Sequence, residues 1–265
     1  MWLKTSCDLT FELSVPTPFI LMLRPRSGGS QWVASEEYRI SSGVSVTECT
    51  DIYGNLCQRL IAPPGIFEIR TSAEVRIADF AEQAPGAAFV EIQNLPDSFL
   101  HYLLPSRYCE SDRFGDMATQ IAEGKLPGYD QVLAIENWLR SNIKYEPGSS
   151  NLPLSAVDVN FMQSGVCRDL AHLGIALCRS LSIPARMVVG YLYKLEPMDL
   201  HAWFEAYVGG KWYTFDAVPT GPKGGYVVVG FGRDAADVAI SNQFGPAAYP
   251  TKQVVRVEQI DSKLC

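Results

Sequence analysis

The hydrophobic pattern of the chain changes near residue 105. Before this point, alternating and β-branched residues are interrupted by turns rich in proline, glycine and asparagine, as expected for short strands. Residues 51–55, with the sequence Asp-Ile-Tyr-Gly-Asn, are typical of a hairpin turn rather than a metal-binding loop. The pattern predicts an antiparallel β-sandwich-like domain over residues 1–105. Its expected strands span residues 10–15, 19–24, 35–46, 65–73 and 74–79.

Helical periodicity begins after this boundary. Apolar residues recur every three or four positions over residues 116–123 and 129–143, which predicts two helices. Asp130 is the expected N-cap of the second helix. A third helix is predicted over residues 167–181, where apolar side chains cover most of the surface and Pro184 follows the end. Three helices in this part of the chain indicate a domain of a different class.

Apolar strands follow the third helix. Helices followed by a run of strands predict an α+β domain over residues 106–265, with helices packed on an antiparallel sheet. The expected strands span residues 185–193, 201–208, 211–218, 226–229 and 253–260.

The composition is that of an ordinary globular protein. The chain has 265 residues, of which 47% are apolar and 19% are charged. Lys plus Arg number 22 and Asp plus Glu 29, and the net charge of -7 argues against a broad basic surface for nucleic acid or an anionic membrane. The first residues lack a basic stretch followed by a long apolar run. We therefore expect no secretory signal, a cytoplasmic location and reduced thiols.

Seven cysteines make an odd number, so at least one thiol lies outside any intramolecular disulfide. No CxxC or HExxH pattern occurs. Cys178 lies eleven residues beyond Cys167 on the same predicted helix, about 16 Å away, and His172 is rotated away from Cys167. A metal site built from these three residues is geometrically poor, and we predict neither a metal nor a cofactor.

Cys167 lies where the third helix is predicted to begin. The unpaired N–H groups and the positive dipole end of a helix favour an anion there, so the position stabilises a thiolate. Gly165 lets the chain enter the helix closely, and Asp169 is expected to cap the first turn or to pair with an arginine. The alternative interpretation is that Cys167 is one more small apolar residue of the core.

A hairpin supplies a second candidate feature. The Gly209-Gly210 link joins two apolar runs, and a tight turn there places Tyr207 opposite Trp212. In that register His201 shares a face with Asp216, one diagonal step of about 7–8 Å away at the backbone. A carboxylate so placed fixes the tautomer of the histidine and stabilises its protonated form. A lone histidine on a strand is more often structural, but this pairing follows independently from the register.

Cys167, His201 and Asp216 have the chemistry of a nucleophile, a base and an orienting group. The sequence of residues 165–193, GVCRDLAHLGIALCRSLSIPARMVVGYLY, resembles the transglutaminase-like superfamily of papain-type thiol enzymes. Residues 199–217 and 230–240 share the resemblance, which covers most of residues 105–260, and residues 1–100 resemble the β-rich region of bacterial members.

The resemblance implies a papain-like core in which the cysteine helix packs on the sheet that carries the histidine and aspartate. It also implies that Cys167 is the nucleophile, His201 the base and Asp216 the third member of the triad. The family often has proline after that aspartate, whereas this chain has Ala217, which should alter the strand end and leave the carboxylate intact.

The groups around the triad are less defined by the sequence. The backbone N–H of Cys167 is one natural oxyanion donor. Tyr145, by loose similarity of position to the family, and Gln163, by its closeness in sequence to Cys167, are alternative side-chain donors. Tyr145 packing between domains is an equal alternative. Trp203 and Trp212 either line the acyl-substrate cleft or pack within the hairpin.

We therefore expect acyl transfer on an amide bond of a peptide or protein substrate, through a thioester. Hydrolysis by a protease or amidase is favoured because water is always available and no dedicated amine pocket can be identified. The alternatives are a protein-glutamine transglutaminase, in which an amine captures the thioester, and a non-catalytic binding module. The β-domain can form a wall of the cleft or mediate homo-oligomer formation.

Overall fold

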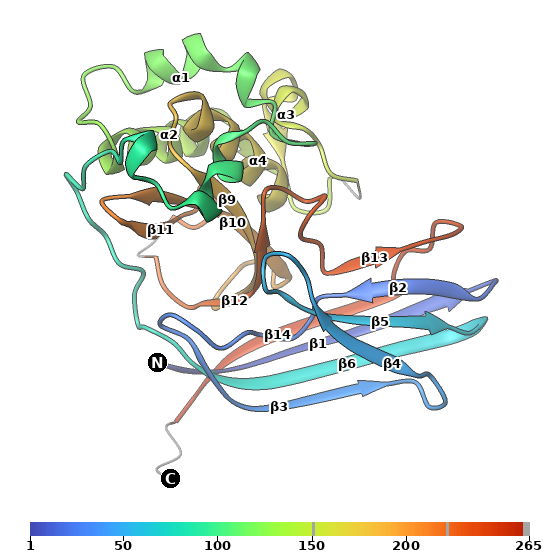
Figure 1. Ribbon diagram of the computed structural model, residues 1–265. Helices are drawn as coiled ribbons and strands as arrows, with labels where there is room; N and C mark the ends of the chain where they lie inside the picture. Colours follow the sequence, from blue (N-terminus) through green and yellow to red (C-terminus); the bar gives the residue numbers. More distant parts are fainter. Residues whose placement is uncertain (150–151, 221–222, 262–265) are drawn as a thin grey trace.

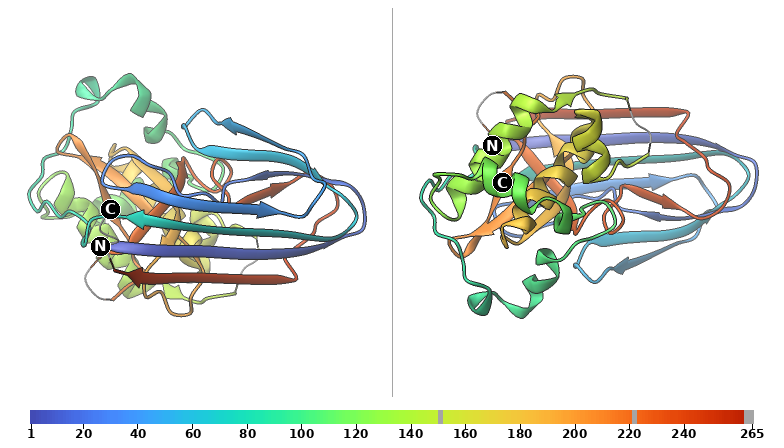
Figure 2. Two further views of the ribbon diagram at one scale, coloured as in Figure 1. Left: turned by 90° about the horizontal axis from the view of Figure 1, so that it is seen from below. Right: turned by 90° about the horizontal axis from the view of Figure 1, so that it is seen from above.

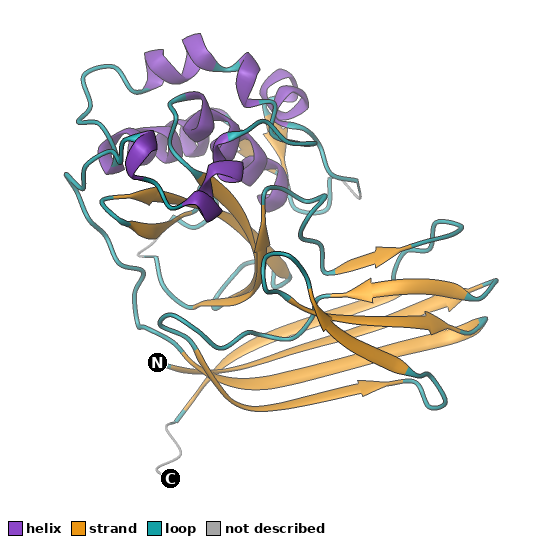
Figure 3. Ribbon diagram, in the orientation of Figure 1, coloured by secondary structure: helices purple, strands orange, loops and turns teal. Residues whose placement is uncertain are grey.

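A computed structural model describes residues 1–149, 152–220 and 223–261. Cys265 and the end of the predicted second domain lie outside the described residues. Figures 1 and 3 show two β-sheets on one side of the molecule and a helical layer over a third sheet on the other. The expected α+β class, with a β-sandwich beside a core of helices on an antiparallel sheet, is confirmed.

The sandwich consists of two antiparallel four-stranded sheets. The first has the order β14 (Lys252–Ile260), β1 (Trp2–Leu13), β6 (Gly65–Arg76) and β3 (Trp32–Ile40). The second has the order β13 (Ser241–Gln243), β2 (Thr17–Leu21), β5 (Leu56–Ala62) and β4 (Val46–Thr50).

The sandwich core follows from strict alternation along its strands. Every second residue of β1 is buried, from Leu3 to Leu13. Phe11 of β1 contacts Phe19 of β2 with ring centroids 5.2 Å apart, and Phe19 lies 5.6 Å from Phe67 of β6. These rings join the two sheets. The expected strands differ from the observed ones in several places. β6 is one continuous strand where two were expected, β1 begins at Trp2 instead of residue 10, and β4, β5 and β13 were not predicted.

The expected division of the chain at residue 105 needs a correction. Strand β14 pairs with β1 along its length, from Lys252 opposite Thr10 to Ile260 opposite Trp2. Figure 2 shows β14, β1, β6 and β3 side by side in one sheet. Val255 and Val257, each 7% exposed, contribute to the buried core. The last strands therefore belong to the sandwich. The sequence could not show this, because alternation identifies a strand without identifying the strand with which it pairs.

The core sheet has the antiparallel order β11 (Lys211–Phe215), β10 (Leu200–Val208), β9 (Ala185–Leu192) and β12 (Tyr226–Gly232). A short parallel pair joins β7 (Lys144–Tyr145) and β8 (Ser164–Gly165). The helices are α1 (Gly115–Ile121), α2 (Tyr129–Asn142), α3 (Ala156–Met162), which was not predicted, and α4 (Cys167–Ser180).

Helix α4 packs closely on the sheet. A Cβ atom added at Gly174 would lie 2.6 Å from the ring of Phe204 on β10, so the close approach requires glycine there. The expected N-cap of α2 is wrong. Gly128, with φ of 107°, precedes the helix, and the carboxylate of Asp130 instead accepts a hydrogen bond from the N–H of Gly86 at 3.0 Å.

A linker and a hairpin connect the two halves of the molecule, the sandwich and the core of helices on the third sheet. The linker contains three short 3-10 helices, Ile92–Asn94, Asp97–Leu103 and Ser111–Arg113. The β4–β5 hairpin, predicted as a turn, reaches β12. The side chain of Asn55 donates to the carbonyl of Phe231 at 2.7 Å and accepts from its N–H at 3.0 Å.

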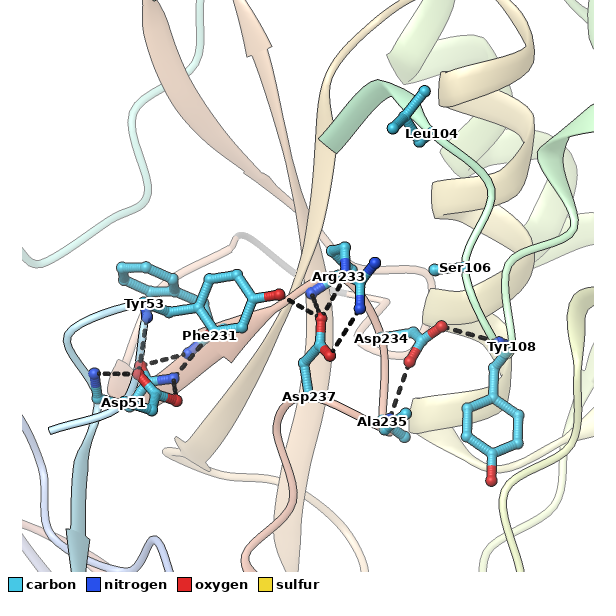
Figure 4. A network of polar contacts seen from close by, with 12 residues as sticks. Asp51, Tyr53, Leu104, Ser106, Tyr108, Phe231, Arg233, Asp234, Ala235 and Asp237 are labelled. Atoms are coloured by element: carbon cyan, nitrogen blue, oxygen red, sulfur yellow. Dashed lines mark hydrogen bonds and ion pairs between the residues drawn. The ribbon is translucent and has the colours of Figure 1, made fainter. Parts of the chain in front are cut away.

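A polar network extends this contact (Figure 4). The hydroxyl of Tyr53 donates to the carboxylate of Asp237 at 2.5 Å, and the same carboxylate accepts from Arg233. Hydrogen bonds therefore join the sandwich to the half that contains the helices. A single cluster of buried apolar residues also extends through both halves. Within the described residues, no helix is long and apolar enough to cross a membrane.

Candidate active site

Cys167 is the first residue of α4, as predicted. The side chain of Asp169 accepts from the N–H of Val166, the N-cap, at 3.2 Å, and also from Nε of Arg168 at 3.0 Å. Both roles expected for Asp169 therefore occur. A Cβ atom added at Gly165 would lie 2.9 Å from Cβ of Asp169, so this tight entry requires glycine. The helix start that presents the thiol is held rigidly.

The hairpin brings His201 and Asp216 together. Tyr207 lies opposite Trp212, as the turn predicted. Nε2 of His201 lies 2.7 Å from Oδ2 of Asp216, and each residue is 2% exposed. Strand β11 ends at Phe215, so Asp216 is the first residue past the strand, and its carboxylate still reaches the histidine.

The charge state of His201 depends on its neighbours. Burial lowers the pKa of His201, but the charge and hydrogen bond of Asp216, together with Cys167, outweigh burial and raise that pKa to about 10. The imidazole is therefore protonated near neutral pH. Its second nitrogen, Nδ1, is buried and has no hydrogen-bond partner among the described residues. Because Asp216 occupies Nε2, Nδ1 is the nitrogen available to exchange a proton with Cys167.

Asp216 is fixed by further contacts that the sequence did not reveal. The hydroxyl of Tyr226 donates to Oδ2 at 3.0 Å, and the N–H of Val218 donates to Oδ1 at 3.0 Å. The backbone N–H of Asp216 donates to Oε1 of Glu136 at 2.7 Å, and its carbonyl accepts from Arg140 at 2.8 Å. The orienting carboxylate is thus held through its side chain and its backbone.

Glu136 anchors this arrangement from α2. It is 1% exposed and accepts from Nζ of Lys223 at 2.6 Å as well as from the backbone of Asp216. One sequence signal could have identified it. Glu136 lies four residues after Val132, inside the apolar stripe of the predicted helix, where a charge has to be paired.

The two alternative oxyanion donors lie in different places. Tyr145 pairs with Gly165 in the β7–β8 ladder and lines the same cavity as Cys167. Burial raises the pKa of Tyr145, and the charge of Cys167 raises it further, so the hydroxyl keeps its proton. Gln163 is exposed, and its side chain donates to the carbonyl of Asn160 at 2.5 Å. The structure brings Tyr145, and not the Gln163 amide, to the cysteine.

A cavity of about 640 Å³ lies beside Cys167 and His201. Its apolar walls come from both halves of the molecule. Met187 and Val189 of β9 line it from the core, and Leu9 of β1 lines it from the sandwich. The sandwich therefore forms one wall of this cleft, which was one of the two roles considered for it.

Trp203 and Trp212 do not line this cleft, which corrects one of the two expectations. They line a separate cavity of about 600 Å³ with the sandwich loop of residues 26–31. The ring of Trp203 is stacked near that of His201, with centroids 5.9 Å apart, so it supports the histidine from the side. Trp212 packs on Phe99 and Tyr207, as the hairpin-packing alternative expected.

His172, the histidine of α4, has a structural role. The N–H of Ala235 donates to Nε2 of His172 at 3.2 Å, so Nδ1 carries the proton and donates to the carbonyl of Leu154 at 2.8 Å. Burial lowers the pKa of His172, and the ring is neutral. Among the described residues, no group of three His, Cys, Asp or Glu side chains is arranged to hold a metal ion.

The described cysteines differ in exposure. Cys49 is exposed and Cys167 is half-buried, whereas the others are buried. Burial raises the pKa of the thiols of Cys109 and Cys178, which keeps them protonated. Cys167 is the half-buried thiol that combines a helix start with a nearby protonated histidine.

Comparisons with known proteins identify the family. The family model described as the transglutaminase-like superfamily matches residues 115–217. The crystal structure of a "Putative Cysteine Protease" from Cytophaga hutchinsonii is similar, with a TM-score of 0.91 and 36% identity, and the alignment covers 100% of this chain and 92% of that one.

Two mycobacterial relatives are uncharacterized. A Mycobacterium leprae protein is 30% identical over 233 residues, which are 82% of each chain. A Mycobacterium tuberculosis protein is 28% identical over 129 residues, 43% of this chain and 41% of its own. The full-length similarity and the family match show that this chain belongs to the transglutaminase-like superfamily.

Proposed function

We propose that this protein is a cysteine-dependent enzyme that hydrolyses amide bonds through a thioester. In this proposal Cys167 is the nucleophile, His201 transfers the proton and Asp216 orients His201. The observation that carries the proposal is the buried His201–Asp216 pair at 2.7 Å, with the α4 cysteine close enough to affect the pKa of the imidazole. A protonated histidine beside a cysteine at a helix start is the arrangement of an activated thiol.

The first half of the reaction forms the thioester. The sulfur of Cys167 attacks the carbonyl carbon, and a C–S bond forms while the carbonyl oxygen becomes an oxyanion. The backbone N–H of Cys167 and the hydroxyl of Tyr145 are the donors proposed for that oxygen. Nδ1 of His201 gives its proton to the leaving nitrogen, the C–N bond breaks, and the amine departs.

The second half returns the enzyme to its starting state. Water attacks the thioester carbon and gives a proton to Nδ1 of His201. The C–S bond breaks, and the carboxylic acid leaves. Asp216 keeps Nε2 hydrogen-bonded throughout, so that Nδ1 faces the reacting groups. Transfer to an amine instead of water remains the second outcome of the same chemistry. Water is favoured because no separate amine pocket is identified.

The experiment uses a library of peptide amides, including glutamine-containing peptides, with and without an added primary amine. Mass spectrometry then distinguishes products that gained water from products that gained the amine. We expect hydrolysis that is lost in Cys167→Ala and retained in Cys49→Ala, which removes an exposed thiol. Peptide binding without turnover, unchanged in Cys167→Ala, would instead support a binding module and contradict the proposal.

A further inference from the structure

The cavity lined by Trp203 and Trp212 is separate from the cysteine cleft and has its own chemistry. It has a volume of about 600 Å³, a size typical of small-molecule sites. One wall is the sandwich loop of residues 26–31, and the other is formed by the core sheet. The reaction proposed for Cys167, His201 and Asp216 uses none of its charged residues.

Two arginines face this cavity. The guanidinium of Arg186 lies over two aromatic rings, 4.2 Å from the centroid of Trp212 and 3.8 Å from that of Phe231. It also pairs with Glu205, at 2.7 Å. Arg26 lies 4.5 Å from the centroid of the same Phe231 ring. The stacking holds both planar groups in fixed orientations.

Arg26 is the less satisfied of the two. The hydrogen bond of its guanidinium within the described residues is a long one, 3.5 Å to Oδ1 of Asn55. Burial lowers the pKa of Arg26, and the repelling charge of nearby Arg186 lowers it further, while the carboxylates of Asp51 and Glu205 act in the opposite direction. An oxyanion between them would relieve this repulsion and supply the missing acceptor.

The other charged residues that line the cavity do not neutralise its excess of positive charge. Lys211 and Glu82 pair with each other at 3.0 Å, and their side chains are 62% and 63% exposed, so they lie toward solvent. The lining thus contains the three cations Arg26, Arg186 and Lys211 against the two carboxylates of Glu82 and Glu205. A site with this balance favours an anion.

The sandwich loop that lines the cavity has backbone N–H groups without a partner among the described residues. Gly28 and Gly29 have φ of 145° and 59°, and a Gly28–Gln31 bridge closes the loop. The N–H groups of Gly29 and Ser30 make no hydrogen bond to another described residue. The Gln31 side chain ties the loop to β12 by bonds of 2.7 and 2.8 Å to Val228. An anchored glycine loop with unpaired N–H groups suits an oxyanion.

We propose that this cavity binds a small molecule carrying a phosphate or carboxylate group. Arg26, Arg186 and the loop N–H groups would hold the oxyanion, and the rings of Trp212 and Phe231 would contact the apolar part of the ligand. The proposal is independent of the thiol chemistry, since Cys167 does not line this cavity.

The test titrates the full chain with phenyl phosphate, inorganic phosphate and benzoate at constant ionic strength, with chloride as the reference anion. Tryptophan fluorescence serves as one readout, because Trp203 and Trp212 line the cavity, and calorimetry as the other. We expect saturable binding, with phenyl phosphate tighter than inorganic phosphate. The order of phenyl phosphate and benzoate identifies the preferred headgroup.

Variants locate the site. Arg26→Gln should weaken binding about tenfold, the loss expected for one charge-assisted hydrogen bond, and Arg26→Lys should lose less. The matched control is Arg70→Gln, whose parent side chain is 62% exposed on β6 and does not line the cavity. Affinity that is equal in wild type and both Arg26 variants, or no saturable binding beyond chloride, would overturn the proposal. Cys167→Ala should bind as wild type does, which separates this test from that of the thiol enzyme.

Discussion

The two halves of the molecule differ in what they bury. Among the described residues, the buried polar side chains of the sandwich and its loops are all uncharged: Thr5, Thr17, Gln31, Asn55, Gln58 and Thr71. The buried ionisable side chains of Asp, Glu, His and Arg all lie in the core: Glu136, Asp169, His172, Arg179, His201, Asp216 and Asp234. Buried ionisable side chains are therefore concentrated in the half that carries Cys167, His201 and Asp216.

This difference has an energetic meaning. Removing a charge from water is costly unless hydrogen bonds and opposite charges compensate for it. The core supplies that compensation in detail. Arg179, for example, donates to the carbonyls of Ala185, Leu104 and Arg233. The sandwich gains stability from apolar packing, whereas the core maintains a charged arrangement that orients His201. Substitutions in the two halves should therefore have different consequences.

The largest effect is expected at Asp216. Asp216→Asn keeps the size of the side chain but removes the charge that raises the pKa of His201. We expect kcat to fall about 10⁴-fold, the loss seen when a triad carboxylate becomes an amide. The measurement is kcat on the best amide substrate, with circular dichroism to verify folding. A loss of less than tenfold would show that Asp216 does not orient the base.

The sandwich should respond in stability rather than in chemistry. Phe19→Ala removes a ring that joins the two sheets and should cost about 3–5 kcal/mol of unfolding free energy. Urea unfolding measures this loss, and kcat per folded molecule should stay unchanged. The control is Ile61→Ala on β5, whose parent side chain is 63% exposed and should change stability by less than about 0.5 kcal/mol. Equal losses in the two variants would refute the packing account.

A substitution at Glu136 should lower both stability and activity. Glu136→Gln leaves Lys223 without its buried carboxylate and weakens the bond to the backbone of Asp216. We expect a loss of about 1–3 kcal/mol in unfolding free energy. We also expect a lower kcat, because the backbone at Asp216 is held less firmly and its carboxylate orients His201 less well. The exposed Glu123→Gln is the matched control. A stability loss with unchanged kcat would mean that Glu136 does not position Asp216.

The smallest effect is expected at Tyr226. Its hydroxyl shares Oδ2 of Asp216 with His201, so Tyr226→Phe should strengthen the His201–Asp216 bond and move the pKa of His201 above its present value of about 10. The alkaline limb of the activity profile should therefore shift to higher pH. The stability cost should be about 0.5–1.5 kcal/mol.

The pH dependence of stability gives an independent check on the same pair. The pKa of His201 is raised on folding from 6.5 to about 10. Its contribution to stability is therefore fully present below pH 6.5 and is lost as the pH rises through 10. In Tyr226→Phe that loss should occur at higher pH, which urea unfolding across this range measures. A shift toward lower pH would contradict the shared-oxygen geometry.

The parts of the fold and of the candidate site that local geometry decides could be predicted from the sequence. A tight turn at Gly209-Gly210 determines which residues of the two strands lie opposite each other. That register places His201 and Asp216 on one face. Helix periodicity located the start of α4 at Cys167. In both cases the relevant partners lie within a few turns or one hairpin of each other, so spacing alone carries the information.

Contacts between residues that are distant in the chain could not be predicted from the sequence. Nothing in the alternation of β14 shows that it pairs with β1, more than 240 residues earlier. The cavity that Trp203 and Trp212 line includes residues 26–31, which only the assembled fold brings near. The contact between Glu136 and Asp216 spans 80 residues for the same reason.

We propose that the environment of Cys167, rather than its exposure, sets the reactivity of its thiol. The direct test is alkylation with iodoacetamide near neutral pH, with the rate at each cysteine followed by mass spectrometry. Exposed Cys49 is the internal reference for half-buried Cys167. We predict that Cys167 is alkylated faster than Cys49 and that His201→Ala removes this advantage while leaving Cys49 unchanged. Faster labelling of Cys49 in the wild type, or a Cys167 rate that does not depend on His201, would contradict the account.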